Sequence, residues 1–176
     1  RTGPRAPPTV IGEPAVLGAA LVREAGLDPR RLRLGPIDVR AVAVGWATVE
    51  LDRAATELPT SPARAITEAA PDELLGATVR LVTGAPDADD GSPIALVLVE
   101  PSTEGLLAAS LARRGEGPLV LYLAPRTGDL RSAVERLAAV GIRSRAGRGP
   151  FGAAALVLGG PVGGPHLVLV AVPSEP

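Results

Sequence analysis

The sequence predicts an α+β fold made of two copies of one strand-helix-three-strand module, preceded by a helical extension. The clearest unit is residues 113–141, where a turn at Gly115 and Gly117 leads into an apolar strand and then a helix that ends at Gly141. The same order of patterns occurs at residues 37–58. Three further strand-like segments follow the helix in each half, so we interpret the chain as a duplicated module.

The N-terminal extension comprises residues 1–36 and contains one predicted helix. Residues 1–9 are rich in proline and lack apolar periodicity, which is typical of a flexible arm. Residues 14–26 favour a helix, because proline suits the first turn and Gly26 a stop. Residues 30–33 form a charged connector. The predicted buried stripe of the helix is Val16, Leu17, Ala20, Leu21 and Ala25.

The first module is predicted at residues 37–101. It begins with a strand at 37–49 that is apolar on both faces and is therefore expected at the centre of a sheet. A helix from Asp52 is cut short by Pro59. The three strands that follow are predicted at residues 65–69, 78–83 and 94–100.

A bridging helix and turn, residues 102–117, lead into the second module at residues 118–173. The strand at 119–124 precedes a helix at 130–140, and a polar tail, 174–176, ends the chain. The other predicted strands of this module are 142–145, 153–158 and 166–172, with Gly147-Arg-Gly-Pro150 and Gly159-Gly160 as turns. The predicted buried stripe of the second helix is Leu130, Val134, Leu137 and Ala138.

The composition excludes several classes of function. The chain has 176 residues, no cysteine and a net charge of −1, so thiolate chemistry and attraction to nucleic acid or an anionic membrane are not expected. No apolar run approaches the roughly 20 residues that span a bilayer, and a cytoplasmic protein is the default expectation. With three aromatic residues among 46% hydrophobic residues, the core must be aliphatic.

Five phrases, in this order along the chain, resemble the vicinal oxygen chelate superfamily of glyoxalases, extradiol dioxygenases and bleomycin-resistance proteins. Methylmalonyl-CoA epimerases are the most similar group within it. The resemblance implies that the paired modules curl into a half-open barrel whose concave face holds a divalent metal ion, and we expect a homodimer. The phrases are Val44-Gly-Trp-Ala-Thr-Val-Glu-Leu-Asp52, Glu73-Leu-Leu-Gly76, Val99-Glu-Pro101, Leu111-Ala-Arg-Arg-Gly-Glu-Gly117 and the helix phrase at 129–141.

The four positions at which the resemblance implies metal ligands hold aliphatic residues. They are Ala43, Val97, Val120 and Val168. Aliphatic side chains offer no lone pair, and a shift of the alignment by one residue brings in only further aliphatic ones. We therefore expect no metal, no other cofactor, and neither metal-dependent epimerase nor glyoxalase activity. The acidic segment 84–93 is interpreted as a turn rather than a calcium loop.

Strand alternation places two polar side chains on the face of the missing ligands. Tyr122 lies two residues after Val120, and His166 two residues before Val168. His166 and Tyr122 are the candidate catalytic residues, while Trp46 and Glu100 should face the opposite side. The candidate ligand-binding residues are Ala43, Val97, Val120, Tyr122, His166 and Val168.

Three functions remain open. The first is a metal-free glyoxalase-like protein that binds a small apolar or amphipathic molecule in the barrel cavity. The second is a metal-independent isomerase, epimerase or lyase, acting on an acyl-CoA or related substrate through His166 and Tyr122. The third is a closed barrel that acts through dimerisation. A pocket reaching Tyr122 and His166 would favour the first two, and close packing around Val120 the third. Arg113 and Arg114 are interpreted as solvated.

Overall fold

The computed structural model describes residues 10–84, 94–102 and 104–171. The predicted arm at 1–9, most of the acidic segment at 84–93 and the predicted tail at 174–176 lie outside these described residues. No helix within the described part is long and apolar enough to cross a membrane.

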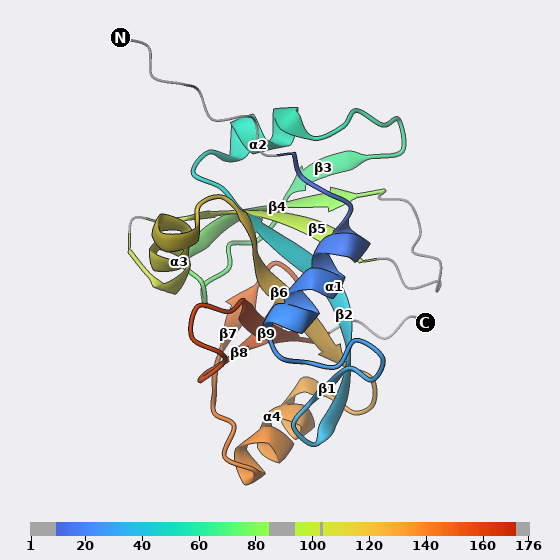
Figure 1. Cartoon of the computed structure of the whole chain (residues 1–176), viewed down its shortest axis with the longest axis vertical. Coiled ribbons are helices and arrows are strands. Elements are labelled where there is room, and N and C mark those ends of the chain that lie inside the picture. The colour runs from blue at the N-terminus through green and yellow to red at the C-terminus, as the bar shows by residue number, and fades with distance from the viewer. Residues whose placement is uncertain (1–9, 85–93, 103, 172–176) are drawn as a thin grey trace.

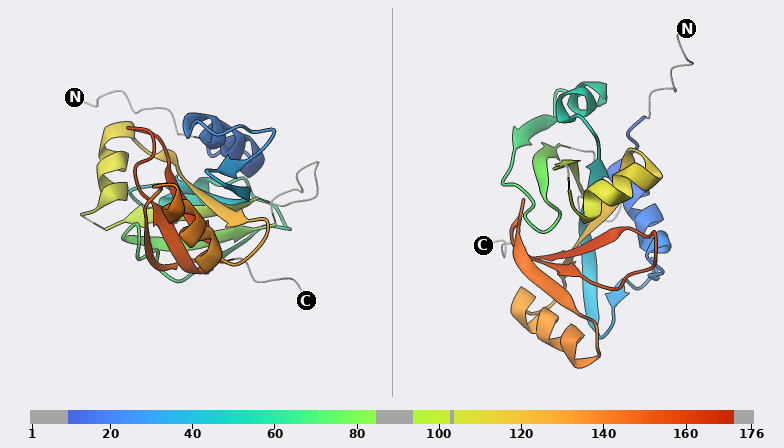
Figure 2. Two further views of the ribbon diagram at one scale, coloured as in Figure 1. Left: turned by 90° about the horizontal axis from the view of Figure 1, so that it is seen from below. Right: turned by 90° about the vertical axis from the view of Figure 1, so that its left-hand side faces the viewer.

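The described residues form a single curled, mixed sheet with four helices (Figure 1, Figure 2). The sheet order is β3-β4-β5-β2-β6-β9-β8-β7, and β1 pairs only with the start of β2. The helices are α1 (Pro14–Glu24), α2 (Leu51–Glu57), α3 (Leu106–Arg114) and α4 (Leu130–Ala139). The strands are β1 (Arg33–Leu34), β2 (Ile37–Ala47), β3 (Ala65–Glu68), β4 (Ala77–Thr83), β5 (Ala95–Pro101), β6 (Gly117–Pro125), β7 (Ser144–Gly149), β8 (Gly152–Val157) and β9 (His166–Val170).

The pairing of the strands confirms the predicted fold class. The first strands of the two modules, β2 and β6, pair antiparallel at the centre of the sheet. Each is flanked on its other side by the last strand of its own module, β5 and β9, in parallel register. The two halves are therefore equivalent βαβββ units that meet edge to edge and form a half-barrel with one concave and one convex face.

The two central strands approach unusually closely at Gly45. Gly45 lies opposite Val120, and the register between β2 and β6 shifts directly after this pair. A Cβ atom at position 45 would lie 2.7 Å from the Cβ of Val120. Only glycine fits without moving one backbone away from the other.

Three helices cover the convex face. Helix α1 lies across β2 and β6, with α2 and α4 on either side (Figure 1). Trp46 packs against Leu51 and Leu58 on this face, as predicted. The predicted buried stripes of two helices are wrong in part. In α1, Val16 is 67% exposed, and Gly18 faces Val44 instead. In α4, Ala133 is buried and Ala138 is exposed. Small residues let these helices approach the sheet, a preference that hydrophobicity alone does not detect.

Two element assignments also need correction. The predicted charged connector ends in a short hairpin, because Arg33 and Leu34 pair with Asp38 and Ile37. Residues 147–149 continue β7 rather than form a turn, and the chain turns back into β8 after Gly149. Glycine has a low propensity for strands, which is why this segment was interpreted as a turn. In the structure, Gly147 and Gly149 lie where Leu74 and Asp72 pack closely on β7.

Two carboxylates of the resemblance phrases hold the ends of the central strands. Glu116 accepts hydrogen bonds from Thr48 Oγ1 at 2.7 Å, the backbone N–H of Val49 at 2.8 Å and Arg53 Nη2 at 2.5 Å. Its partial burial raises the pKa of Glu116, but these hydrogen bonds outweigh the burial and lower it overall. Glu100, on the convex side as predicted, accepts from the N–H of Leu51 at 2.7 Å.

We expect Gly45→Ala to destabilise the fold by about 1–3 kcal/mol, because the added methyl group overpacks the contact with Val120. Urea unfolding followed by circular dichroism would measure the change in free energy. Gly160→Ala is the matched control, since no atom lies within 4 Å of a Cβ placed there. Equal unfolding midpoints for the two variants would contradict the close approach of β2 and β6.

Candidate functional site

The register of the four central strands brings the predicted site positions together on the concave face. Ala43 lies opposite Tyr122, which lies opposite Val168. In the adjacent row, Val97 pairs with Gly45, Gly45 with Val120, and Val120 with His166. The predicted ligand-binding residues thus occupy two neighbouring rows across β5, β2, β6 and β9. Ala43, Val97, Val120, Tyr122 and Val168 are each 0% exposed.

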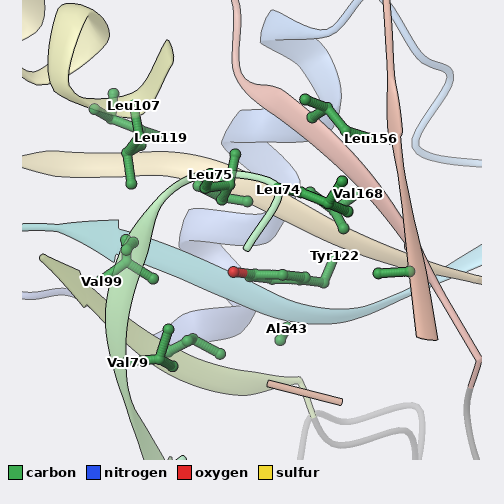
Figure 3. Close-up of a cluster of buried hydrophobic side chains, with 14 of the residues drawn as sticks. Ala43, Leu74, Leu75, Val79, Val99, Leu107, Leu119, Tyr122, Leu156 and Val168 are labelled. Atoms are coloured by element: carbon green, nitrogen blue, oxygen red, sulfur yellow. The ribbon is translucent and has the colours of Figure 1, made fainter. Parts of the chain in front are cut away.

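These side chains are covered by a segment that crosses the concave face, residues 69–76, which we call the strap. Leu74 and Leu75 of the strap point into the half-barrel beside Tyr122 and Val168 (Figure 3). Leu107 of α3 closes the same cluster from its other end. The concave face is therefore a packed hydrophobic core, and a ligand cannot reach its central strands unless the strap moves.

The strap joins the first module to the far edge of the second. The N–H of Glu73 donates to the carbonyl oxygen of Arg148 at 3.0 Å, and Arg145 Nη2 donates to the carbonyl oxygen of Leu74 at 2.6 Å. A Cβ at Gly147 would lie 2.7 Å from Leu74 Cδ2. The glycine in β7 therefore makes room for the leucine that fills the barrel.

A buried carboxylate fixes the strap to the sheet. Asp72, which is 0% exposed, accepts a hydrogen bond from the Tyr122 hydroxyl at 2.9 Å through Oδ2 and one from the N–H of Leu75 at 3.0 Å through Oδ1. Burial raises the pKa of Asp72, and its hydrogen bonds oppose this only in part. Burial first, and the Asp72 charge second, raise the pKa of Tyr122 well above its ordinary value. Tyr122 is thus a protonated donor at neutral pH.

The donor set on the concave face does not fit a divalent metal ion. The four positions implied by the resemblance carry only methyl and methylene carbons. Within residues 10–84, 94–102 and 104–171, no group of three or more His, Cys, Asp or Glu side chains could hold a metal. Asp72 contributes a single carboxylate that is already satisfied.

His166 has a different environment from Tyr122. It begins β9, and its Nε2 lies 2.9 Å from Ser110 Oγ on α3. Arg113 Nη2, one turn further along the helix, lies 3.4 Å from the same Ser110 oxygen. Burial, and then the charges of Arg113 and Arg114, lower the pKa of His166, so the imidazole is neutral at pH 7. The structure thus gives the two predicted catalytic residues separate partners.

Ser110, Arg113 and His166 line a surface hollow of about 240 Å³ between α3 and the loop that joins β8 to β9. Leu106, Leu156 and Pro165 supply apolar lining. One of two other hollows on the described residues shares residues 157–161 and Leu167 with this one, and the other is lined by residues of β5 and α3. None of the three reaches Tyr122 or Val120.

The two arginines beside the glycine turn are both exposed, as expected, but they have different partners. Arg114 pairs with Glu24 at 2.7 Å and donates to the carbonyl oxygen of Gly163 at 3.0 Å, which ties the β8–β9 loop to α1. Arg113 lines the hollow. In the sequence, Ser110 stands among Leu106, Leu107 and Leu111 of the predicted bridging helix, and this single serine was the only signal of a polar site.

The curled half-barrel of paired βαβββ modules is the glyoxalase-like fold, here with an additional N-terminal helix on its convex face. No protein-family model and no curated protein matches the sequence.

Among solved structures, similar folds include a methylmalonyl-CoA epimerase variant from Streptomyces coelicolor in complex with 2-nitronate-propionyl-CoA. It has a TM-score of 0.62 and 21% identity, over 78% of this chain and 98% of that one. The epimerase from Mycobacterium tuberculosis has a TM-score of 0.61 and 23% identity, over 77% and 88%. A hypothetical protein from Bacillus halodurans has a TM-score of 0.58 and 14% identity, over 78% and 96%. At these identities the similarity establishes the fold.

We expect Asp72→Asn to flatten the dependence of stability on pH. Because the folded pKa of Asp72 is raised, its contribution to stability is complete below the ordinary carboxylate pKa and is lost as pH rises through the folded pKa. The stability of Asp72→Asn relative to the native chain should therefore increase from pH 4 to pH 7. Urea unfolding at several pH values would measure it.

The control for this experiment is Asp72→Ala, which leaves the Tyr122 hydroxyl and the Leu75 N–H without an acceptor. It should lose about 1–3 kcal/mol for each unsatisfied group. Parallel stability curves for the native chain and Asp72→Asn would show that the buried carboxylate does not titrate as the structure implies.

Proposed function

We propose that this chain is a metal-free protein of the glyoxalase-like fold that binds a small amphipathic molecule through a carbonyl or carboxylate group. The close packing around Val120 is the outcome expected for a closed barrel, so we propose that the binding site is the hollow at the end of the concave face rather than the barrel cavity. One observation carries the proposal: Ser110, Arg113 and His166 meet at an accessible hollow, whereas the central strands are covered by the strap.

The absence of a metal follows from the side chains at the four implied positions. In a metal-binding relative these positions would carry ligands, and here Ala43, Val97, Val120 and Val168 replace them. A divalent ion without at least three protein ligands would not be retained against water. The replacement of the ligands is therefore part of the proposed function.

The chemistry of the hollow indicates the ligand class. Arg113 supplies a positive charge there, and no carboxylate among the described residues forms an ion pair with it. Ser110 and neutral His166 add hydrogen-bonding groups, while leucine and proline side chains supply the apolar lining. The hollow is smaller than the roughly 300–1,000 Å³ of a drug-sized pocket. A short acyl chain with a polar end fits these properties, and acyl groups also occur in the ligands of the similar epimerase structures.

The alternative enzyme that uses His166 and Tyr122 together is less well supported. The Tyr122 hydroxyl is buried and bonded to Asp72, so it could act on a substrate only after the strap had moved. The homodimer and the cytoplasmic location expected from the sequence stay predictions.

The first test concerns the metal. We expect the purified 176-residue chain, incubated with zinc, cobalt or manganese and then dialysed, to retain less than a tenth of an equivalent. Elemental analysis by mass spectrometry would measure retention, and thermal unfolding should be unchanged by the ions because no binding energy is gained. One equivalent of metal per chain would contradict the proposal.

The second test concerns the ligand. We expect butyrate to bind in the hollow and to shift the backbone amide resonances of residues 159–167, and butylammonium, with the same chain but opposite charge, to bind at least tenfold more weakly. Arg113→Leu should weaken butyrate binding about tenfold or more, which equals a loss of about 1.4 kcal/mol.

Arg131→Leu is the control, because Arg131 is exposed on α4 and does not line the hollow. If butyrate instead shifted residues around Val120 and Tyr122, the ligand would enter the barrel and the proposed location would be wrong. Equal binding of butyrate and butylammonium would remove the role of Arg113.

A further inference from the structure

We infer that Ser110, His166 and Arg113 form a nucleophile, a general base and an oxyanion-binding group that hydrolyse short-chain carboxylic esters at the hollow. This inference rests on the proposed function, because it requires the hollow to accept a molecule with a carbonyl group. It adds a covalent reaction to that binding role.

The Ser110–His166 pair has the geometry of an activated nucleophile. The distance of 2.9 Å between Ser110 Oγ and His166 Nε2 lies within the roughly 2.6–3.2 Å expected for a nucleophile and its base. When the imidazole carries its proton on Nδ1, Nε2 accepts the hydrogen bond of the serine hydroxyl. Burial and the neighbouring arginine charges keep His166 neutral, which leaves Nε2 able to accept the proton at pH 7.

Arg113 is placed to stabilise the negative charge that develops during attack. Its Nη2 lies 3.4 Å from Ser110 Oγ, on the same side of α3. The carbonyl oxygen of a substrate bonded to Ser110 would therefore develop its charge beside the guanidinium group. Backbone N–H groups in the middle of α3 are occupied by helical hydrogen bonds, so a side chain must supply this stabilisation.

The surroundings select for a small ester. Ser110 is only 5% exposed, yet it lines the hollow together with His166, so a substrate reaches it from the open side. Leu106, Leu156 and Leu158 offer contact for a short acyl chain. The volume of about 240 Å³ leaves no room for a long one.

The reaction is balanced as an ester hydrolysis with water as co-reactant. Ser110 Oγ forms a bond to the ester carbonyl carbon while its proton passes to His166 Nε2. The bond from that carbon to the alcohol oxygen then breaks, and the proton moves from Nε2 to the leaving alcohol. Water attacks the acyl-serine with its proton again taken by His166, which releases the carboxylic acid and returns the proton to Ser110.

The test uses the full chain and p-nitrophenyl butyrate. We expect release of p-nitrophenol above the buffer rate and, in intact-mass spectra, a butyryl adduct that peptide mapping places on Ser110. Ser110→Ala should abolish the adduct, and Ser110→Ala and His166→Gln should each reduce the rate by about 100-fold or more. Arg113→Leu should slow acylation, whereas Ser132→Ala, an exposed serine on α4, should change nothing.

The outcomes separate the inference from the proposed function. Butyrate binding to the native chain, followed by amide resonances, tests the proposed function, whereas the adduct on Ser110 tests the inference. If butyrate binds but the native chain forms no Ser110 adduct, or if Ser110→Ala hydrolyses the ester at the native rate, the inference is overturned while the binding role stands. If butyrate does not bind, both fail. Should Ser110→Ala not fold, peptide mapping of the native chain decides, because an adduct on any other residue also overturns the inference.

Discussion

The interior of this protein depends on one buried carboxylate. An ionised carboxylate out of water costs several kcal/mol, and hydrogen bonds from the Tyr122 hydroxyl and the Leu75 N–H offset part of that cost for Asp72. The bond from Tyr122 joins the strap to the middle of β6, and the bond from Leu75 holds the turn within the strap. With the strap held there, Leu74 packs into the concave face of the sheet. The strap therefore covers the concave face, which is a packed core and not an open cleft.

Because apolar side chains fill the concave face, the polar side chains that line a hollow lie at the end of that face. His166 belongs to the same cross-strand row as Val97 and Val120, but it starts its strand and so lies at the margin of the packed cluster. There α3 places Ser110 against it. The β8–β9 loop is held at this margin by Arg114, which bonds both Glu24 and Gly163. A polar hollow therefore lies beside a core that is almost entirely apolar.

Local patterns were enough to predict most of the fold and only part of the site. Strand alternation correctly placed Val120, Tyr122 and Val168 on one face, because side-chain direction in a strand depends on residue parity alone. The decisive contacts, Tyr122 with Asp72 and Ser110 with His166, join residues 50 and 56 positions apart. No local pattern specifies such pairs. The strap was missed for the same reason, since its leucines pack on strands far away in the sequence.

The phrases that identified the fold carry structural rather than chemical information. Glu116, in the most specific phrase, binds Thr48, Val49 and Arg53, and it thereby joins the start of β6 to the end of β2. Glu100 accepts a hydrogen bond from the backbone N–H of Leu51 and so satisfies the start of α2. Any sequence that pairs β2 with β6 in this way needs groups that satisfy these exposed backbone ends, whatever occupies the barrel. Such phrases are therefore compatible with either a polar or an aliphatic concave face, and a resemblance built on them predicts architecture without predicting a reaction. The chemistry has to be inferred from polar side chains that line an accessible hollow, and among the described residues we infer it from Ser110, Arg113 and His166.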